Sequence, residues 1–138
     1  MRLWHKNLIP ALPREQLVAQ WREISAIAGN IQTKGTPNHI LVNKIMNYGF
    51  NHFITYAAAV RSEMTSRGYR TMDKVWDKIV ALAPDYNIIP IDEIYPDWMN
   101  HEYLTICYYN LKEKWICGGI SDSDWQRIEN LYKTVMIN

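Results

Sequence analysis

The stretch PREQLVAQWREISAIAGN, residues 13–30, decides the fold class of this chain. Apolar residues recur in it at steps of three and four, which is the spacing of one stripe on an α-helix. The stripe consists of Leu17, Trp21, Ile24 and Ala28. Pro13 suits the first helical turn, and Gly29-Asn30 supplies a stop signal. The sequence therefore predicts a long amphipathic helix over residues 13–30.

Helical patterns fill most of the rest of the chain. Apolar spacing, glycine stops and capping residues predict His39–Met46, Asn51–Arg67, a helix between a Thr71 cap and Pro84, Asn100–Cys117, and a last helix after a capping box at Ser121–Asp124. Gly68 and the pair Gly118-Gly119 are expected to end two of these helices in the left-handed conformation.

Two segments do not fit a helix. Residues 31–38 are polar with Gly and Pro, which predicts a loop. Residues 84–97 carry three prolines and are typical of an ordered connection, in which a short strand at Ile88-Ile89 stays open. We therefore expect an all-α fold, a single domain over residues 1–138 with about five helices and an irregular Pro-rich connection.

The composition is that of an ordinary globular protein, with 48% hydrophobic and 21% charged residues. Lys and Arg number 15 against 14 Asp and Glu, so the net charge of +1 provides no strong overall attraction for polyanions. Nucleic-acid binding would have to come from local charge. Cys107 and Cys117 fit a reducing compartment, and the sequence offers neither a signal peptide nor an apolar stretch of the roughly 20 residues that span a bilayer. We expect a cytoplasmic protein without a membrane partner.

Several common chemistries have no motif in this chain. There is no Walker or dinucleotide-type glycine loop, no HExxH, no CxxC and no GxSxG. The histidines are too widely spaced for a metal signature; they are His5, His39, His52 and His101. The sequence therefore predicts neither a metal nor a cofactor.

The charged face of the first long helix is the informative feature. At about 100° per residue, Arg22 and Glu23 lie away from the apolar stripe, beside the small residues Ala19 and Ala26. Helical spacing alone favours a solvated pair of surface charges, because such pairs decorate most surface helices.

A resemblance gives this pair another meaning. The segment EQLVAQWREI, residues 15–24, preceded by Met1-Arg2-Leu3, resembles the catalytic helix of the pyrimidine-dimer DNA glycosylase family, the bacteriophage ultraviolet-repair endonuclease type. The resemblance continues in Gly29, in an Asn-His element at His39 and in the segment SRGY at residues 66–69, with an echo in LKEK at residues 111–114. It covers the first half of the chain.

The resemblance implies a small helical enzyme that acts on damaged double-stranded DNA. In that family the N-terminal α-amine attacks the sugar C1′ of a damaged nucleotide, releases the base through an imine, and cleaves the strand by β-elimination. A model α-amine has a pKa of about 7.7 to 8.0 against about 10.4 for Lys, so much of it is neutral near pH 7. Because Arg2 is too large for the usual removal of the initiator methionine, the nucleophile is expected to be the α-amine of Met1.

The resemblance also assigns the other site residues. Glu23 would stabilise cationic sugar and iminium character and then move the proton needed for elimination. Arg22 would hold a phosphate and Arg2 would assist. The family's phage enzyme has a further Arg where this chain has Ala26, and a His where it has Gln16, so phosphate contacts and substrate choice need not match.

The remaining cations are unevenly distributed. No Lys or Arg occurs from Ile79 to Leu111, whereas a basic run precedes it and consists of Arg61, Arg67, Arg70, Lys74 and Lys78. The last three are four residues apart, so they would line one helix face able to contact phosphates. Asp73 and Asp77 interleave with them, which leaves a solvated mixed-charge helix as the alternative. His39 and Lys44 complete the DNA-binding residues that we expect.

Two functions therefore stay open. The first is a DNA glycosylase with abasic-site lyase activity, built on Met1 and Glu23. The second is a noncatalytic helical module that keeps the family fold and binds DNA or protein; Ala26, Gln16 and the mixed charge motivate it. The sequence specifies neither the lesion nor the oligomeric state.

Overall fold

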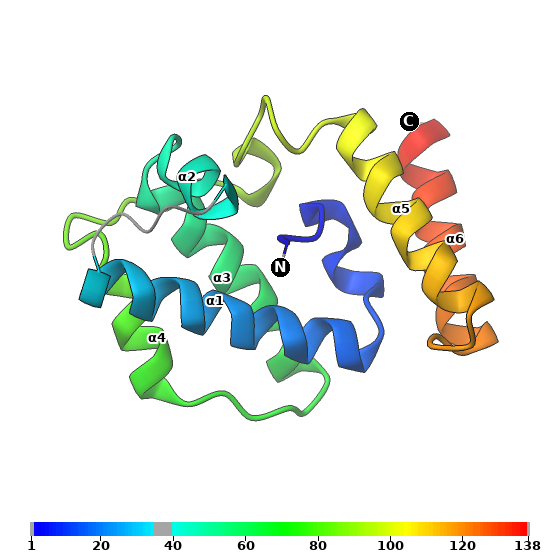
Figure 1. The fold of residues 1–138 in the computed structure, drawn as a ribbon, viewed down its shortest axis with the longest axis horizontal. Helices are drawn as coiled ribbons and strands as arrows, with labels where there is room; N and C mark the ends of the chain where they lie inside the picture. Colours follow the sequence, from blue (N-terminus) through cyan, green and yellow to red (C-terminus); the bar gives the residue numbers. More distant parts are fainter. Residues whose placement is uncertain (1, 35–39, 138) are drawn as a thin grey trace.

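The computed structural model describes residues 2–34 and 40–137, and in these ranges the chain forms helices and no strand (Figure 1). The elements are η1 (Lys6–Ala11), α1 (Arg14–Lys34), α2 (Ile40–Met46), α3 (Phe50–Ser66), α4 (Asp73–Val80), η2 (Ile91–Glu93), α5 (His101–Ile116) and α6 (Asp122–Ile137); η1 and η2 are 3-10 helices. The all-α prediction is confirmed, and the described helices slightly outnumber the five expected.

Helix α1 buries the predicted stripe. Leu17, Ile24 and Ala28 have no exposed surface, and Trp21 is 7% exposed. The predicted stop at Gly29-Asn30 is wrong, as is the predicted loop over residues 31–34, because the helix continues to Lys34. Ile31 extends the buried stripe by one more step of three, and a glycine inside a helix costs only about 1 kcal/mol. The rest of that loop, residues 35–38, lies outside the described residues.

The glycine stops after α3 and α5 are confirmed. Gly68 has φ 82° and Gly118 has φ 86°, a region that side chains with a Cβ rarely adopt. The following N–H groups turn back to helix carbonyls, Tyr69 to Met64 at 2.9 Å and Gly119 to Lys114 at 2.8 Å. These bonds are the pattern of a Schellman motif, which satisfies carbonyls that the helix end leaves free.

Helix α4 differs from its prediction at both ends. Met72 precedes its first turn, and the Thr71 hydroxyl accepts a hydrogen bond from Arg61 Nε at 2.9 Å instead of capping the helix. The helix ends at Val80, before Pro84. The connection that follows contains no strand at Ile88-Ile89, where Ile88 is 83% exposed, and it is anchored by Ile94 and Tyr95, which are fully buried.

The last two helices form an antiparallel pair (Figure 1). Asn100 caps α5 by accepting from the Tyr103 N–H, and the Ser121 hydroxyl accepts from the Asp124 N–H at 3.2 Å at the start of α6. Stacked rings join the two helices, Tyr108 on Tyr132 and Trp115 on Trp125. Within the described ranges no helix is both long and apolar enough to cross a membrane.

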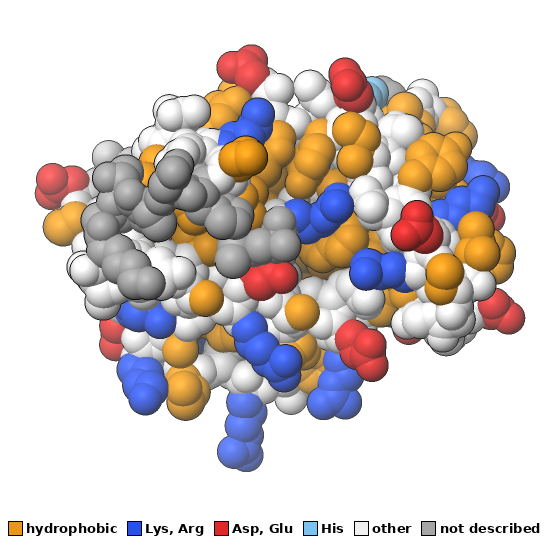
Figure 2. Space-filling view, in the orientation of Figure 1, with side chains coloured by type: hydrophobic (Ala, Val, Ile, Leu, Met, Phe, Trp, Pro, Cys, Tyr) orange, Lys and Arg blue, Asp and Glu red, His pale blue; other side chains and the backbone are white. Residues whose placement is uncertain are grey.

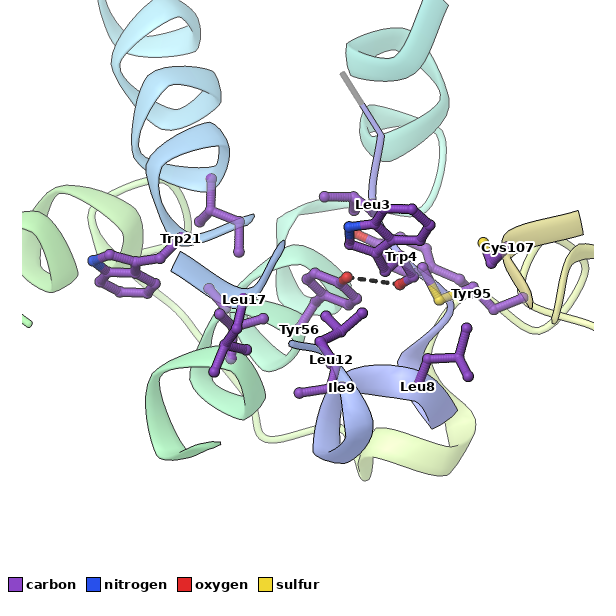
Figure 3. Packing of buried hydrophobic residues seen from close by; sticks show 14 of the residues in the cluster. Leu3, Trp4, Leu8, Ile9, Leu12, Leu17, Trp21, Tyr56, Tyr95 and Cys107 are labelled. Atoms are coloured by element: carbon purple, nitrogen blue, oxygen red, sulfur yellow. Dashed lines mark hydrogen bonds between the residues drawn. The ribbon is translucent and has the colours of Figure 1, made fainter. Parts of the chain in front are cut away.

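The N-terminal segment lies between two groups of helices. In Figure 1 it occupies the middle of the ribbon, with α1 and α3 on one side and α5 and α6 on the other. Helix η1 contacts both α3 and α6, so the segment joins the two groups of helices. Leu3, Trp4 and Leu8 belong to the hydrophobic core that Figure 3 shows from close by.

Candidate functional site

Residues 2–5 form the N-terminal segment, in which Arg2 is half-buried and the other three residues are buried. Leu3 is not exposed, Trp4 is 7% exposed and His5 is 1% exposed. A buried backbone needs hydrogen-bond partners, and this one finds them on side chains of the surrounding helices. The Leu3 carbonyl accepts from the Tyr103 hydroxyl of α5 at 2.5 Å. The Trp4 carbonyl accepts from the Tyr56 hydroxyl of α3 at 2.6 Å, a bond that Figure 3 shows as a dashed line.

Gln20 of α1 connects this segment to Glu23. Its Oε1 accepts from the Trp4 N–H at 2.8 Å and lies 2.9 Å from the Tyr56 hydroxyl, whose proton is shared with the Trp4 carbonyl. Its Nε2 donates to the Arg2 carbonyl at 3.0 Å and to Glu23 Oε2 at 3.4 Å. One buried amide therefore holds Arg2, Trp4 and the candidate carboxylate together.

A pocket of about 420 Å³ opens beside this amide, a size within the usual range of ligand sites. We call it the Glu23 pocket; the residues that line it include Arg2, Trp4, Glu15, Gln16, Gln20 and Glu23 and, from α5, Asn110 and Lys114. Gln16 contributes a buried Oε1 without a hydrogen-bond partner among the described residues. Figure 2 shows hydrophobic side chains between α1 and α5 on this face, with basic side chains close by.

Of the two predicted catalytic residues, the structure describes Glu23 but not Met1. Glu23 is half-buried in the Glu23 pocket, and no ion pair of the described residues involves it. Met1 lies outside the described residues, as does the predicted DNA contact His39. Arg2, one residue from Met1, lines the Glu23 pocket, and its guanidinium carbon lies 5.1 Å from the centre of the Trp4 ring.

Arg22 is exposed and faces other pockets than its neighbour Glu23, since adjacent residues on a helix point about 100° apart. It lines a hollow of about 360 Å³ together with Arg70. It lines a second hollow of about 520 Å³, which we call the Arg14 pocket, with Arg14, Glu15 and Val18. Glu15 lines both the Arg14 pocket and the Glu23 pocket, so the two pockets are neighbours. Arg22 therefore lines the pocket next to the one that contains the Glu23 carboxylate.

The expected row of Arg70, Lys74 and Lys78 on one helix face is wrong for Arg70. Helix α4 begins at Asp73, so Arg70 belongs to the loop before it. Lys74 is exposed on α4, whereas Lys78 is half-buried and its Nζ donates to Ser25 Oγ of α1 at 2.9 Å. Arg70 and Lys78 therefore lie next to α1, and only Lys74 and Lys78 share a helix face.

Two further residues of the basic run and the expected DNA contact Lys44 have partners within the protein. Arg61 pairs with Asp73 at 2.6 Å, and Arg67 pairs with Glu63 at 2.8 Å and donates to the Leu12 carbonyl. Lys44 of α2 lies 5.6 Å from the centre of the Trp98 ring. These contacts give each side chain a structural role, and none of the three lines the Glu23 pocket.

Sequence reasoning missed four residues around the site. Tyr56 and Tyr103 lie far from α1 in the chain, so helical spacing alone could not connect them to it. Gln20 precedes Glu23 by three residues and follows Gln16 by four, which places all three on one helix face and could have identified it. Arg14 could have been found as a cation at a helix N-terminus, where the helix dipole disfavours positive charge.

Burial controls the ionisation of the groups that hold the segment. It raises the pKa of the Tyr56 and Tyr103 hydroxyls well above the ordinary value, so both stay protonated and can donate. It lowers the pKa of His5 to about 4, and this ring is neutral near pH 7. The described residues contain no group of three His, Cys, Asp or Glu side chains that could hold a metal.

Comparison with known protein families gives a match over the first part of the chain. The profile of the family described as pyrimidine dimer DNA glycosylase matches residues 1–77, which include the N-terminal segment, α1, α2, α3 and the start of α4. Searches among curated proteins and among solved structures found no match. The matched part covers more than half of the chain and contains the segment, Gln20 and Glu23, so this chain belongs to the pyrimidine dimer DNA glycosylase family.

Proposed function

We propose that this protein is a DNA repair glycosylase with abasic-site lyase activity, in which the α-amine of Met1 is the nucleophile. The observation that carries the proposal is the shared amide of Gln20, which donates to both the Arg2 carbonyl and Glu23. Met1 is bonded directly to Arg2, and consecutive Cα atoms are about 3.8 Å apart, which supports our assignment of an α-amine close to the carboxylate. Membership of the family supports the same assignment.

The proposed reaction begins with the neutral amine. Its lone pair attacks the sugar C1′ of the damaged nucleotide, the bond from C1′ to the base breaks, and the base leaves with a proton. Opening of the sugar ring gives an imine between the amine and C1′. Removal of a proton from C2′ then breaks the bond from C3′ to its phosphate oxygen, and water hydrolyses the imine to free the amine.

Glu23 is the group that we assign to charge stabilisation and proton transfer. A carboxylate beside C1′ stabilises the cationic sugar and the protonated imine, and it can accept the C2′ proton afterwards. Glu23 suits this role because its hydrogen bond from Gln20 Nε2 is long, at 3.4 Å, and no cation neutralises it among the described ion pairs.

We propose that damaged double-stranded DNA contacts the exposed side of α1. Arg22 and Arg70, which share one hollow, and Lys74 are the phosphate contacts that we favour, with Arg2 at the Glu23 pocket and Arg14 added to them. None of the five forms an ion pair among the described residues, in contrast to Arg61 and Arg67. His39, Lys44 and Lys78 stay predicted contacts, the latter two with competing partners in Trp98 and Ser25.

Reductive trapping tests the reaction. Untagged protein is incubated with duplex DNA that contains an abasic site, and borohydride is added to reduce the imine to a stable secondary amine. We expect a covalent adduct whose peptide map places the DNA on residue 1. Absence of an adduct would favour the noncatalytic binding module, which could still bind the same DNA.

An N-terminally extended form of the protein tests which amine reacts. A stable extension consumes the α-amine of Met1 in a peptide bond, so the extended protein should lose both the adduct and strand cleavage. A protease that removes the extension, with Met1 as the new first residue, should restore both. Full lyase activity of the extended protein would overturn the assignment of the nucleophile.

A further inference from the structure

Side chains of three helices hold the backbone of the N-terminal segment in place through hydrogen bonds. Three side chains from three helices contribute them, and we call these side chains the clamp: Gln20 of α1, Tyr56 of α3 and Tyr103 of α5. Two of the three are almost fully buried, with Gln20 1% and Tyr56 0% exposed, and Tyr103 is half-buried. The segment is therefore held from three sides.

The clamp binds consecutive residues of the segment. Gln20 binds Arg2 and Trp4, Tyr103 binds the Leu3 carbonyl and Tyr56 binds the Trp4 carbonyl. The Trp4 N–H requires an acceptor and the Arg2 carbonyl requires a donor, so the two ends of the Gln20 amide have a fixed orientation. A packed segment with backbone bonds at three successive residues has little freedom to move.

We infer that Gln20, Tyr56 and Tyr103 are positioning residues that set the distance between the chain end and Glu23; this inference rests on the proposed function. An extended chain end ordinarily frays, which would cost an N-terminal nucleophile its orientation. The Gln20 amide removes that freedom and at the same time contacts the carboxylate, so the nucleophile and the proton acceptor share one support. A misplacement of about 1 Å can cost about 100-fold in rate.

Two variants separate the parts of the clamp. Tyr103→Phe removes the hydroxyl that binds the Leu3 carbonyl and keeps the ring, and Tyr132→Phe is its matched control because that hydroxyl contacts Thr105 in the α5–α6 pair. Gln20→Glu keeps an acceptor for the Trp4 N–H but places a carboxylate oxygen against the Arg2 carbonyl and Glu23. Gln126→Glu on the exposed side of α6 is the control for that change.

The measurements are the single-turnover rate of strand cleavage at an abasic site, the affinity for the same DNA, and hydrogen exchange of the Trp4 amide. We expect Tyr103→Phe to lower the rate by about 10-fold and Gln20→Glu by about 100-fold, with affinities within about twofold of the wild type. Neither control should change the rate. Trp4 amide exchange should stay slow in Gln20→Glu, which shows that the segment is still folded in place.

The pH dependence gives a readout that a purely structural role would not move. The charged residues that line the Glu23 pocket are Arg2, Glu15, Glu23 and Lys114. An added carboxylate at position 20 stabilises the ammonium form of a nearby amine, so the rate of Gln20→Glu should reach its plateau at higher pH than the wild-type rate.

The outcomes distinguish the inference from the proposed function. Clamp variants that cleave at the wild-type rate, while the wild type forms its adduct, would overturn the inference and leave the function standing. A slower rate explained entirely by weaker DNA binding would overturn it as well. A wild-type protein that forms no adduct would overturn the proposed function and, with it, a catalytic role for the clamp.

Discussion

Two pockets of this protein differ in size and in chemistry. Arg2 and Trp4 of the N-terminal segment line the smaller one, the Glu23 pocket of about 420 Å³. A larger pocket of about 710 Å³, the Lys6 pocket, is lined by residues of η1, α3, η2 and α6, and its surface is mostly apolar. Lys6 and Asp92 are among its charged residues.

Polar groups in the two pockets differ in the hydrogen bonds and ion pairs that they already make within the protein. In the Lys6 pocket the ammonium of Lys6 donates to the carbonyls of Asp92 at 3.0 Å and Ile94 at 2.6 Å, and Glu63 is paired with Arg67. In the Glu23 pocket the carboxylate has one long contact and Gln16 Oε1 has none among the described residues. The Glu23 carboxylate therefore keeps hydrogen-bonding capacity for a substrate, whereas Lys6 and Glu63 of the larger pocket are already bound by other groups of the protein.

The largest expected effect is on Glu23. We expect Glu23→Gln to lower the single-turnover rate of strand cleavage by about 10³-fold, because general acid–base groups contribute about 10² to 10⁴. The neutral amide can still accept from Gln20, so folding should be little changed. Asp92→Asn removes a carboxylate from the Lys6 pocket and should leave the rate unchanged. A loss of rate in Asp92→Asn that matches the loss in Glu23→Gln would erase the distinction between the pockets.

The buried N-terminal segment should make the stability of the protein depend on pH. His5 Nε2 lies 2.8 Å from the Met99 carbonyl, which makes Nε2 the protonated nitrogen, and Nδ1 accepts from the Asn7 N–H. Burial lowers the pKa of this ring from 6.5 to about 4, so the unfolded chain binds a proton more readily than the folded one. The stability that His5 contributes is present above pH 6.5 and is lost as the pH falls through 4, by about 3 kcal/mol in all.

Chemical denaturation at a series of pH values measures this loss. His5→Gln removes the titrating ring while keeping a donor and an acceptor, so its free energy of unfolding should fall less steeply between pH 6.5 and 4 than that of the wild type. An unchanged slope would mean that other groups cause the acid sensitivity. His52, whose pKa burial also lowers, is one such group.

Lys6 is the competing amine. Burial lowers its pKa, with Asp92 opposing the shift, and a lysine with a lowered pKa is the usual type that forms imines. We expect Lys6→Met to keep the borohydride adduct and to lose about 1–3 kcal/mol of unfolding free energy, because the Asp92 and Ile94 carbonyls lose their donor. Loss of the adduct in a folded Lys6→Met protein would indicate that the reacting amine is that of Lys6, in the larger pocket.

The helices could be predicted because their signals are local. The α1 stripe, the glycine stops at Gly68 and Gly118 and the Asn100 start each depend on residues a few positions apart. The extension of α1 beyond Gly29 and the start of α4 at Asp73 were missed, since contacts with the core outweighed weak local stop and start signals. Helix η1 contains Pro10 and has no apolar period, so spacing gave no signal for it.

The candidate site could be predicted only in part. Glu23 lies off the apolar stripe by helical spacing alone, but the burial of residues 2–5 depends on partners 16 residues away at Gln20 and 52 away at Tyr56. Sequence spacing carries no information on such contacts. The same holds for Lys78, whose ammonium donates to Ser25 of α1, a contact that its spacing from Lys74 did not indicate.

The smallest expected effect concerns Arg14. It tests whether DNA contacts the surface near the Arg14 pocket or the surface near the Lys6 pocket. Arg14 is the first residue of α1, where a cation costs about 0.3–1 kcal/mol against the helix dipole, and no ion pair of the described residues offsets that cost. Its guanidinium carbon lies 5.1 Å from the centre of the Tyr69 ring, and the side chain lines the Arg14 pocket together with Arg22. A phosphate contact would account for a cation at this position.

The salt dependence of DNA affinity measures whether Arg14 contacts a phosphate. We expect Arg14→Ala to reduce the slope of log affinity against log salt by about 1 on damaged duplex DNA, since each neutralised phosphate contributes about 0.9. Its free energy of unfolding should stay the same or rise slightly, because the unfavourable cation is gone. Lys133→Ala on α6, the helix that borders the Lys6 pocket, is the matched control and should leave the slope unchanged. Equal reductions in the two variants would show only the general effect of net charge, whereas a reduction in Lys133→Ala alone would place the DNA on the side of the Lys6 pocket.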